Sequence, residues 1–235
     1  MYSNHKFNER SRMSEIINED ASLLLTISRF GISLGFGDKT VKEACDANGI
    51  HCRTFLAVIN FIAEGNVVVH ETYEHISIES VINYLKNAHH YFLTYKLPSI
   101  RAKLMEAVES SDQSEPYKVV FMKFFDEYFQ EVRKHMDYED KTVFPYVMRL
   151  LAGSPDKKYR IADFEEHHTD VDSKLSELKN IIVKYYPSKG QNYKMNDVLF
   201  DLYACEKDLA LHNMIEDFFF VPVIEAIEEK TTSHE

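Results

Sequence analysis

The sequence predicts an all-α protein, an up-down-up-down four-helix bundle preceded by a small helical N-terminal domain. Glycine and proline are scarce, at 7 and 6 of 235 residues, which argues against turn-rich β architectures. Four long segments carry apolar residues at helical intervals, namely 78–107, 116–151, 159–185 and 194–228. The links at 110–115, 153–158 and 187–192 are short, so consecutive helices should be antiparallel neighbours.

The N-terminal region has shorter helical signals. Apolar residues recur at helical spacing over residues 15–30, and further short helices are expected at 41–48 and 54–63. Glycines in the segment 31–37 should break the chain between the first two of these helices. We therefore expect two domains, a small helical domain over residues 1–70 and the bundle over residues 77–228.

The charge and cysteine content narrow the functional classes. The net charge of −11 comes without a basic patch, so neither nucleic acid nor membrane is an expected partner. The polar start and short apolar runs predict a cytoplasmic protein. Cys45, Cys52 and Cys205 form no C-x-x-C motif, and we expect them to be buried as free thiols.

A repeated motif lies on the second and fourth long helices. The second helix has His135 followed by Glu139-Asp140 and then Pro145. The fourth has His212 followed by Glu216-Asp217 and then Pro222. Because the spacing is the same in both, the two helices should present one histidine and one glutamate each to the same surroundings.

The apolar pattern around the histidines predicts their direction. Apolar residues precede His135 and His212 by 3, 7, 10 and 14 positions, and they follow His90 and His168 at the same offsets. These are core-facing offsets, so antiparallel packing should bring the four histidines to one level. Helix spacing alone does not exclude the neighbouring His89 and His167, but the apolar offsets favour His90 and His168.

Inward imidazoles and carboxylates cannot remain bare in a core, since unpaired buried charge is costly. A pair of metal ions resolves this, with two imidazoles on each ion and two bridging carboxylates. Nitrogen and oxygen donors suit iron, with manganese or zinc as competitors, and a two-metal site can hold a small ligand. The predicted metal ligands are His90, His135, Glu139, His168, His212 and Glu216.

At these residues the sequence resembles the hemerythrin-like, histidine–histidine–glutamate cation-binding family over residues 77–228. The matching features are His90 before Leu97-Pro98, His135 and Glu139 before Phe144-Pro145, His168, and His212 and Glu216 before Pro222. The resemblance implies a four-helix bundle. It also implies a non-haem centre of two iron ions, bridged by oxo or hydroxo and by the two glutamates.

The subtype looks like the iron–sulfur cluster repair di-iron proteins. Oxygen-carrying hemerythrins have a fifth histidine on the third helix, where this chain has Phe164 and Asp172 four residues either side of His168. They also carry an aspartate five residues after the last histidine, whereas Glu216 comes four after. The repair proteins have a small helical N-terminal domain with a Cys-Cys pair before Gly-Gly, and residues 34–38 lack that pair.

These features support two main functions. The first is a di-iron protein of iron–sulfur cluster repair, or of the response to nitric oxide and oxidative stress. The second is a sensor or store that binds oxygen or nitric oxide without turnover. Expected partners are O2 or NO, iron–sulfur proteins, and a second copy of the chain, paired through the N-terminal domain.

Two other functions fit the sequence less well. The roles of two acidic residues are also left open. A ferritin-like oxidase needs a second Glu-x-x-His motif beside Glu165 and His168. If the chain were a metal-free interaction domain, the matching positions of the predicted metal ligands on the four helices would be a coincidence. Asp140 and Asp217 could accept hydrogen bonds from ligand imidazoles, but we favour surface acids for both.

Overall fold

The computed structural model describes residues 6–65, 73–109, 114–154, 159–167, 172–186 and 192–232. Within these ranges the regular secondary structure is helical and there is no β-strand, only an isolated bridge that joins Arg12 and Thr40. The all-α prediction is therefore confirmed. The chain divides into two compact units, one made of Met1–Ala88 and Leu211–Glu235, the other of His89–Ala210. The expected boundary between residues 70 and 77 stays a prediction.

The first unit begins with four short helices: α1 (Met13–Glu19), α2 (Leu23–Arg29), α3 (Val41–Asn48) and α4 (Cys52–Ala63). The single helical stretch expected over 15–30 is wrong, because a turn at Asp20 divides it. The Asp20 carboxylate accepts hydrogen bonds from the Ser22 backbone N–H at 2.9 Å and from the Ser22 hydroxyl at 2.6 Å. Such side-chain bonds to nearby backbone compete with helix continuation.

The same unit also holds the short helix η1 (Tyr73–His75) and the C-terminal helix α12 (Val221–Thr232). Lys230 of α12 pairs with Glu74 of η1 at 2.9 Å. Phe61 of α4 packs against Phe218 and Phe219, with ring centroids 5.3 and 5.2 Å away. Long-range contacts of this kind give the first unit its own apolar core.

Four long helical runs follow the expected order along the chain. Each run joins several elements that continue one another or lie close in sequence: α5 (Ile78–Tyr91), η2 (Phe92–Lys96) and α6 (Leu97–Glu109); α7 (Ser114–Tyr138), η3 (Glu139–Val143) and α8 (Phe144–Leu151); α9 (Ile161–His167) and α10 (Asp172–Tyr185); α11 (Tyr193–Ile215), η4 (Glu216–Phe220) and α12.

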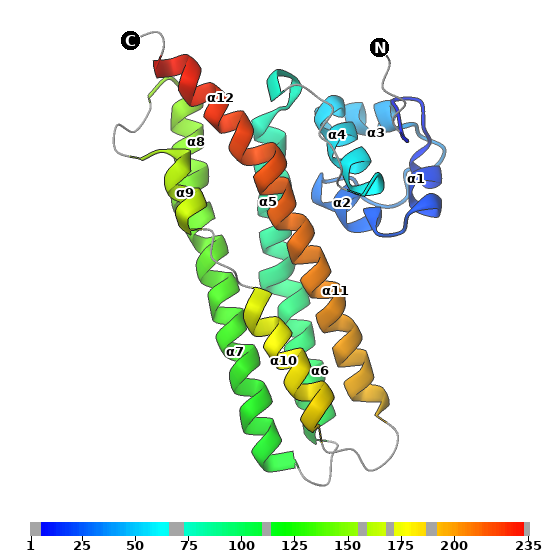
Figure 1. The fold of residues 1–235 in the computed structure, drawn as a ribbon. Helices are drawn as coiled ribbons and strands as arrows, with labels where there is room; N and C mark the ends of the chain where they lie inside the picture. The colour runs from blue at the N-terminus through cyan, green and yellow to red at the C-terminus, as the bar shows by residue number, and fades with distance from the viewer. Residues whose placement is uncertain are drawn as a thin grey trace. The chain divides into compact units, whose positions relative to one another are not determined.

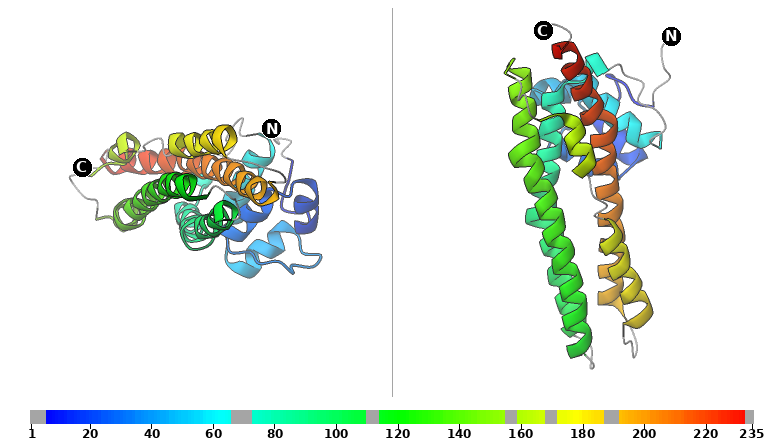
Figure 2. Two further views of the ribbon diagram at one scale, coloured as in Figure 1. Left: turned by 90° about the horizontal axis from the view of Figure 1, so that it is seen from below. Right: turned by 60° about the vertical axis from the view of Figure 1, so that its left-hand side comes forward.

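Within the second unit these runs are antiparallel neighbours (Figures 1 and 2). Between α6 and α7, Arg101 pairs with Asp126 and Glu109 with Lys118, so one helix ascends as the other descends. The same reversed order joins α7 to α10 and α11 to α6, and an ion pair also links α10 to α11. The pairs are Glu131 with Lys174, Phe121 with Tyr186, Lys179 with Glu206, Asp201 with Lys103, and Lys194 with Glu106. The up-down-up-down four-helix arrangement is confirmed.

Three π-helical turns, η2, η3 and η4, interrupt these helices. In each, the backbone N–H just after the turn bonds to the carbonyl five residues earlier, as Phe144 does to Glu139. A proline follows each turn, at 98, 145 and 222. Proline has no N–H and its ring would clash with the carbonyl four residues before it in a continuous α-helix. A π turn holds one extra residue, so the faces before and after it differ in register by one position.

Among the described residues, no helix combines the length and the apolar character that a membrane crossing would require.

Candidate metal centre

One buried carboxylate lies between two imidazoles of the second unit. Glu139 is inaccessible to solvent. Its Oε2 lies 2.9 Å from Nε2 of His89, and its Oε1 lies 2.8 Å from Nε2 of His135. Glu139 therefore presents one nitrogen to each of its oxygens, four residues along the helix from His135 and across from the end of α5.

The approach of these atoms differs from ordinary hydrogen bonding. Within the described part of the chain, neither carboxylate oxygen of Glu139 has a hydrogen bond of normal geometry. Two donor atoms that share one cation at about 2.1 Å lie roughly 3 Å apart when they meet at a right angle. The measured separations of 2.8 and 2.9 Å match that spacing. The donor set and its geometry therefore fit a metal ion.

The repeat supplies a second pair of the same kind. His212 of α11 and Glu216 of η4 are both buried, and His212 Nε2 lies 3.1 Å from Glu216 Oε1. Glu139 and Glu216 are each the first residue of a π turn, and each carbonyl accepts the bond that closes its turn. The predicted equivalence of the two motifs is thus reproduced in their local structure.

Four of these side chains form a cluster able to hold a metal ion. His89, Glu139, His212 and Glu216 each offer one ligand atom, and all four atoms lie within 4.8 Å of one another. Every one of the four residues is buried. Two imidazoles and two carboxylates in a space this small, away from water, suit a cation, which would offset the cost of burying the carboxylates.

His90 does not have the inward orientation expected for it. Its side chain is exposed, and His89 is the residue that reaches Glu139. The apolar offsets that favoured His90 run through η2, whose extra residue shifts the register by one. Phe92, Leu97, Ile100 and Leu104 are buried, and they follow His89 by 3, 8, 11 and 15 positions. Subtracting the inserted residue beyond Phe92 gives the core-facing offsets 3, 7, 10 and 14.

The assignment on the third helix lies outside the described residues. His168 and the side chain of His167 both belong to that gap. Phe164, which stands where a further histidine would come one turn earlier, is buried as an apolar residue. The inward offsets predicted further along this run hold at Leu175, Leu178 and Ile182, all of which are buried.

Asp140 was expected at the surface, but it contacts the cluster. Its Oδ1 accepts a hydrogen bond from Nδ1 of His89 at 3.0 Å. With a proton fixed on Nδ1, the other ring nitrogen, Nε2, faces Glu139. Burial lowers the pKa of His89, but the carboxylates of Asp140 and Glu139 outweigh it and raise the pKa to about 9. Asp217, the counterpart of Asp140 in the repeat, is exposed.

The aromatic ring of Phe144 supports the imidazole of His89. The His89 ring stacks on Phe144 with centroids 5.6 Å apart and planes 16° from parallel. Phe144 is the residue directly after η3, so the π turn that presents Glu139 also brings this ring beneath His89. The motif residue before the proline therefore holds the His89 ring in place, a role that the apolar pattern did not reveal.

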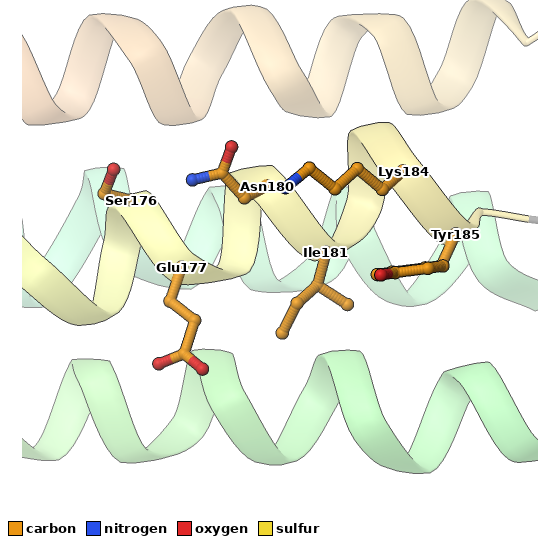
Figure 3. Close-up of a pocket in the computed structure, with 6 residues that line it drawn as sticks. All are labelled: Ser176, Glu177, Asn180, Ile181, Lys184 and Tyr185. Atoms are coloured by element: carbon orange, nitrogen blue, oxygen red, sulfur yellow. The ribbon is translucent and has the colours of Figure 1, made fainter.

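Other features of the described structure have no comparable donor set. An open groove along α10 is lined by Ser176, Glu177, Asn180, Ile181, Lys184 and Tyr185 (Figure 3). It contains one carboxylate and no histidine. All three cysteines are buried and free, as predicted. Burial raises the pKa of Cys45 and of Cys52, which disfavours the reactive thiolate.

Comparison with known protein families identifies the bundle region. Residues 80–224, more than half of the chain, match the family described as the hemerythrin HHE cation binding domain. No curated protein matches the chain. The matched segment includes every histidine and glutamate of the cluster.

Proposed function

Because this chain belongs to the hemerythrin HHE cation-binding family, we propose that it is a non-haem di-iron protein. The observation that supports this best is Glu139, a fully buried carboxylate with an imidazole nitrogen within 3 Å of each oxygen. The residues that would hold the metal pair are His89, His135, Glu139, His212, Glu216 and, on the third helix, His168 or its neighbour His167. This donor set favours iron, with manganese and zinc as the alternatives.

A metal pair held here would supply a site that binds a small diatomic molecule, O2 or NO. The protein's own residues prepare the site for that. Asp140 holds the Nδ1 proton of His89, which keeps Nε2 available to metal once the second proton has left. Phe144 covers the face of the same ring and limits access of water to it.

The role we propose is repair of iron–sulfur clusters, or protection from nitric oxide and oxidants. Supporting it are the absence of a further histidine at Phe164, which is buried among apolar residues, and Glu216 as the last ligand. The small N-terminal helices α1 to α4 also agree with this subtype. Iron–sulfur proteins are then the partners.

A second function has its own supporting observation. Cys45, Cys52 and Cys205 are buried thiols, and residues 34–38 offer no Cys-Cys pair for exchange chemistry. A chain without accessible thiols suits a sensor or store, which binds O2 or NO reversibly without turnover.

Metal content and optical spectrum are the first experiment, on protein from iron-replete cells. About two irons per chain are expected. His89→Ala should lose metal, whereas His90→Ala, one residue away and exposed, should keep it. Equal metal content in the two variants would contradict the ligand assignment. Absence of metal from the parent protein would contradict the di-iron proposal itself.

A second experiment separates the two roles. Repair predicts that the iron-loaded chain restores the activity of a protein whose iron–sulfur cluster nitric oxide has damaged. The His89→Ala variant should not do so. Sensing predicts reversible spectral changes with O2 or NO and no restored activity.

A further inference from the structure

A stripe of aromatic side chains lies on the outer face of α11, far along the helix from His212. Tyr193, Phe200 and Tyr203 are exposed to 66%, 74% and 51%. Core residues of the same helix, such as Val198, Leu202 and Cys205, are buried at about 1% or less. Helical geometry puts Tyr193 and Phe200, seven residues apart, on one line, with Tyr203 one turn beyond Phe200. Exposed contiguous apolar patches usually mark an interaction surface.

From this face we propose that α11 is the contact through which two copies of the chain pair, antiparallel, about a twofold axis near Phe200. The proposal is independent of the metal centre. It moves the expected dimer contact from the N-terminal domain to α11.

The stripe is complementary to itself. A twofold axis at Phe200 sets residue 193 of one copy opposite residue 207 of the other, because both lie seven residues from the axis. Position 207 is an exposed lysine that makes no ion pair within the described part of the chain. Its ammonium would lie over the exposed ring of Tyr193, a favourable cation–π contact that occurs twice per dimer. Isologous interfaces require this kind of self-complementarity.

Most charges beside the stripe are already neutralised within one copy. On one flank Asp201 pairs with Lys96 at 2.7 Å and with Lys103 at 2.6 Å, and Lys194 pairs with Glu106 at 2.9 Å. On the other flank Lys179 pairs with Glu206 and lies 4.3 Å from the ring centre of Tyr203. Within the described part of the chain, a second copy therefore meets aromatic surface on which most neighbouring charges are paired, and the exposed side chains of Asp197 and Lys207 are the exceptions.

The area is sufficient for a dimer. Val183, one turn after Lys179 on the neighbouring helix α10, is also 62% exposed. With aromatic side chains of about 200 Å² each, the four residues offer on the order of 500 Å² per copy. The polar residues between them, Asn196 and Lys207, bring the buried area toward the ~800 Å² per partner of a standard interface.

Sedimentation of the full chain at increasing concentration tests the proposal. The parent protein should dimerise, and Phe200→Glu should weaken dimerisation by roughly tenfold or more, as loss of a central aromatic contact does. The matched control is Leu34→Glu, because Leu34 is also 74% exposed but lies in the first unit. Added salt should strengthen pairing, since each copy carries a net charge of −11 that salt screens.

A cross-linking experiment tests the position of the twofold axis through the gain of a disulfide bond. Phe200→Cys should form an intermolecular disulfide rapidly when diamide takes up the two electrons and two protons, whereas Leu34→Cys should not. A parent protein that stays monomeric at high concentration and high salt would overturn the proposal, and the face would then serve a different partner. A dimer that Phe200→Glu leaves unchanged, or equal cross-linking of the two cysteine variants, would overturn it as well.

Discussion

The Asp140 carboxylate controls which nitrogen of His89 is presented to Glu139. Its Oδ1 accepts a hydrogen bond from Nδ1 of His89 at 3.0 Å, while Nε2 of the same ring lies 2.9 Å from Oε2 of Glu139. We expect Asp140→Asn to keep the fold and to lower metal affinity by about 10–100-fold, because the amide can present a donor where an acceptor is needed. Titration of the metal-free protein with Fe²⁺ measures this.

Asp137→Asn is the matched control for that experiment. Asp137 lies on the same helix, and its carboxylate pairs with Lys141 at 2.8 Å on the surface. If the two variants bind metal with equal affinity, Asp140 has no role in orienting the imidazole.

The protonation of His89 links the stability of the metal-free chain to pH. Its folded-state pKa of about 9 is above its ordinary value of 6.5. The folded chain therefore binds the proton more tightly, and this stabilisation is fully present below pH 6.5 and lost as the pH rises to 9. Over that window the free energy of unfolding should fall more steeply with rising pH than it does in His89→Gln.

Urea unfolding of both proteins at several pH values, with chelator present, checks the effect. Metal binding must displace the same proton, so the affinity of the parent protein for Fe²⁺ should increase over the same pH window. Parallel stability profiles for the parent and the variant would show that His89 is neutral without metal.

At this scale the sequence predicted residue types better than positions. The repeat identified His135, Glu139, His212 and Glu216, and all four lie where the motif placed them. It favoured His90 over the neighbouring His89, since counting core-facing offsets from His90 assumes 3.6 residues per turn throughout. The prolines that follow each motif were the available signal that this assumption fails.

The π turn η2 is the element that separates the two registers of the first long helix. Within this turn the Thr94 hydroxyl donates a hydrogen bond to the His90 carbonyl at 2.6 Å. Thr94 is exposed, and Pro98 follows in the next turn. Removing one residue here should convert the π turn to an α turn while both flanking faces keep their direction.

We therefore expect deletion of Thr94 combined with Pro98→Ala to leave a folded bundle with a similar melting temperature. Deletion of Ala102, an exposed residue inside α6, is the control. It should rotate Leu104 and Val108 by about 100° out of the core and cost several kcal/mol. Thermal unfolding followed by circular dichroism compares the two deletions. Equal destabilisation would mean that the π turn is not a removable insertion.

The helices themselves were predictable where their apolar pattern is long. The segment 78–107 corresponds to α5 through α6, and 194–228 lies within α11 through α12. The break at Asp20 was not predicted, because Leu23, Leu24 and Ile27 continue the apolar spacing across it. The hydrogen bond from the Ser22 backbone N–H to the Asp20 carboxylate favours the break, and the apolar periodicity contains no information about such local bonds.

On the scale of the whole molecule, antiparallel pairing followed from link length alone, and the ion pairs between α6, α7, α10 and α11 bear it out. The domain boundary expected between residues 70 and 77 stays a prediction. Leu211–Glu235 groups with Met1–Ala88, far back in the chain, and the local sequence does not show this long-range grouping. Packing between distant segments depends on surface shape, which periodicity does not encode.

We also expect the buried cluster to make the stability of the molecule depend on metal. Two buried carboxylates in Glu139 and Glu216 repel each other unless a cation or a proton lies between them. A ligand that binds only the folded chain stabilises it by about 2.7 kcal/mol at one hundred times its dissociation constant. For a chain of this length we expect adding Fe²⁺ to raise the melting temperature by roughly 5–10 °C.

Chelation should reverse the increase, and the double variant His135→Ala/Glu216→Ala should show none. That variant separates two sources of stability, because it removes carboxylate repulsion as well as metal binding. We expect it to melt above the metal-free parent protein or close to it, and below the iron-loaded one. An unchanged melting temperature of the parent protein on addition of iron would mean that protonation alone balances the buried carboxylates, and that the cluster does not need a metal to be stable.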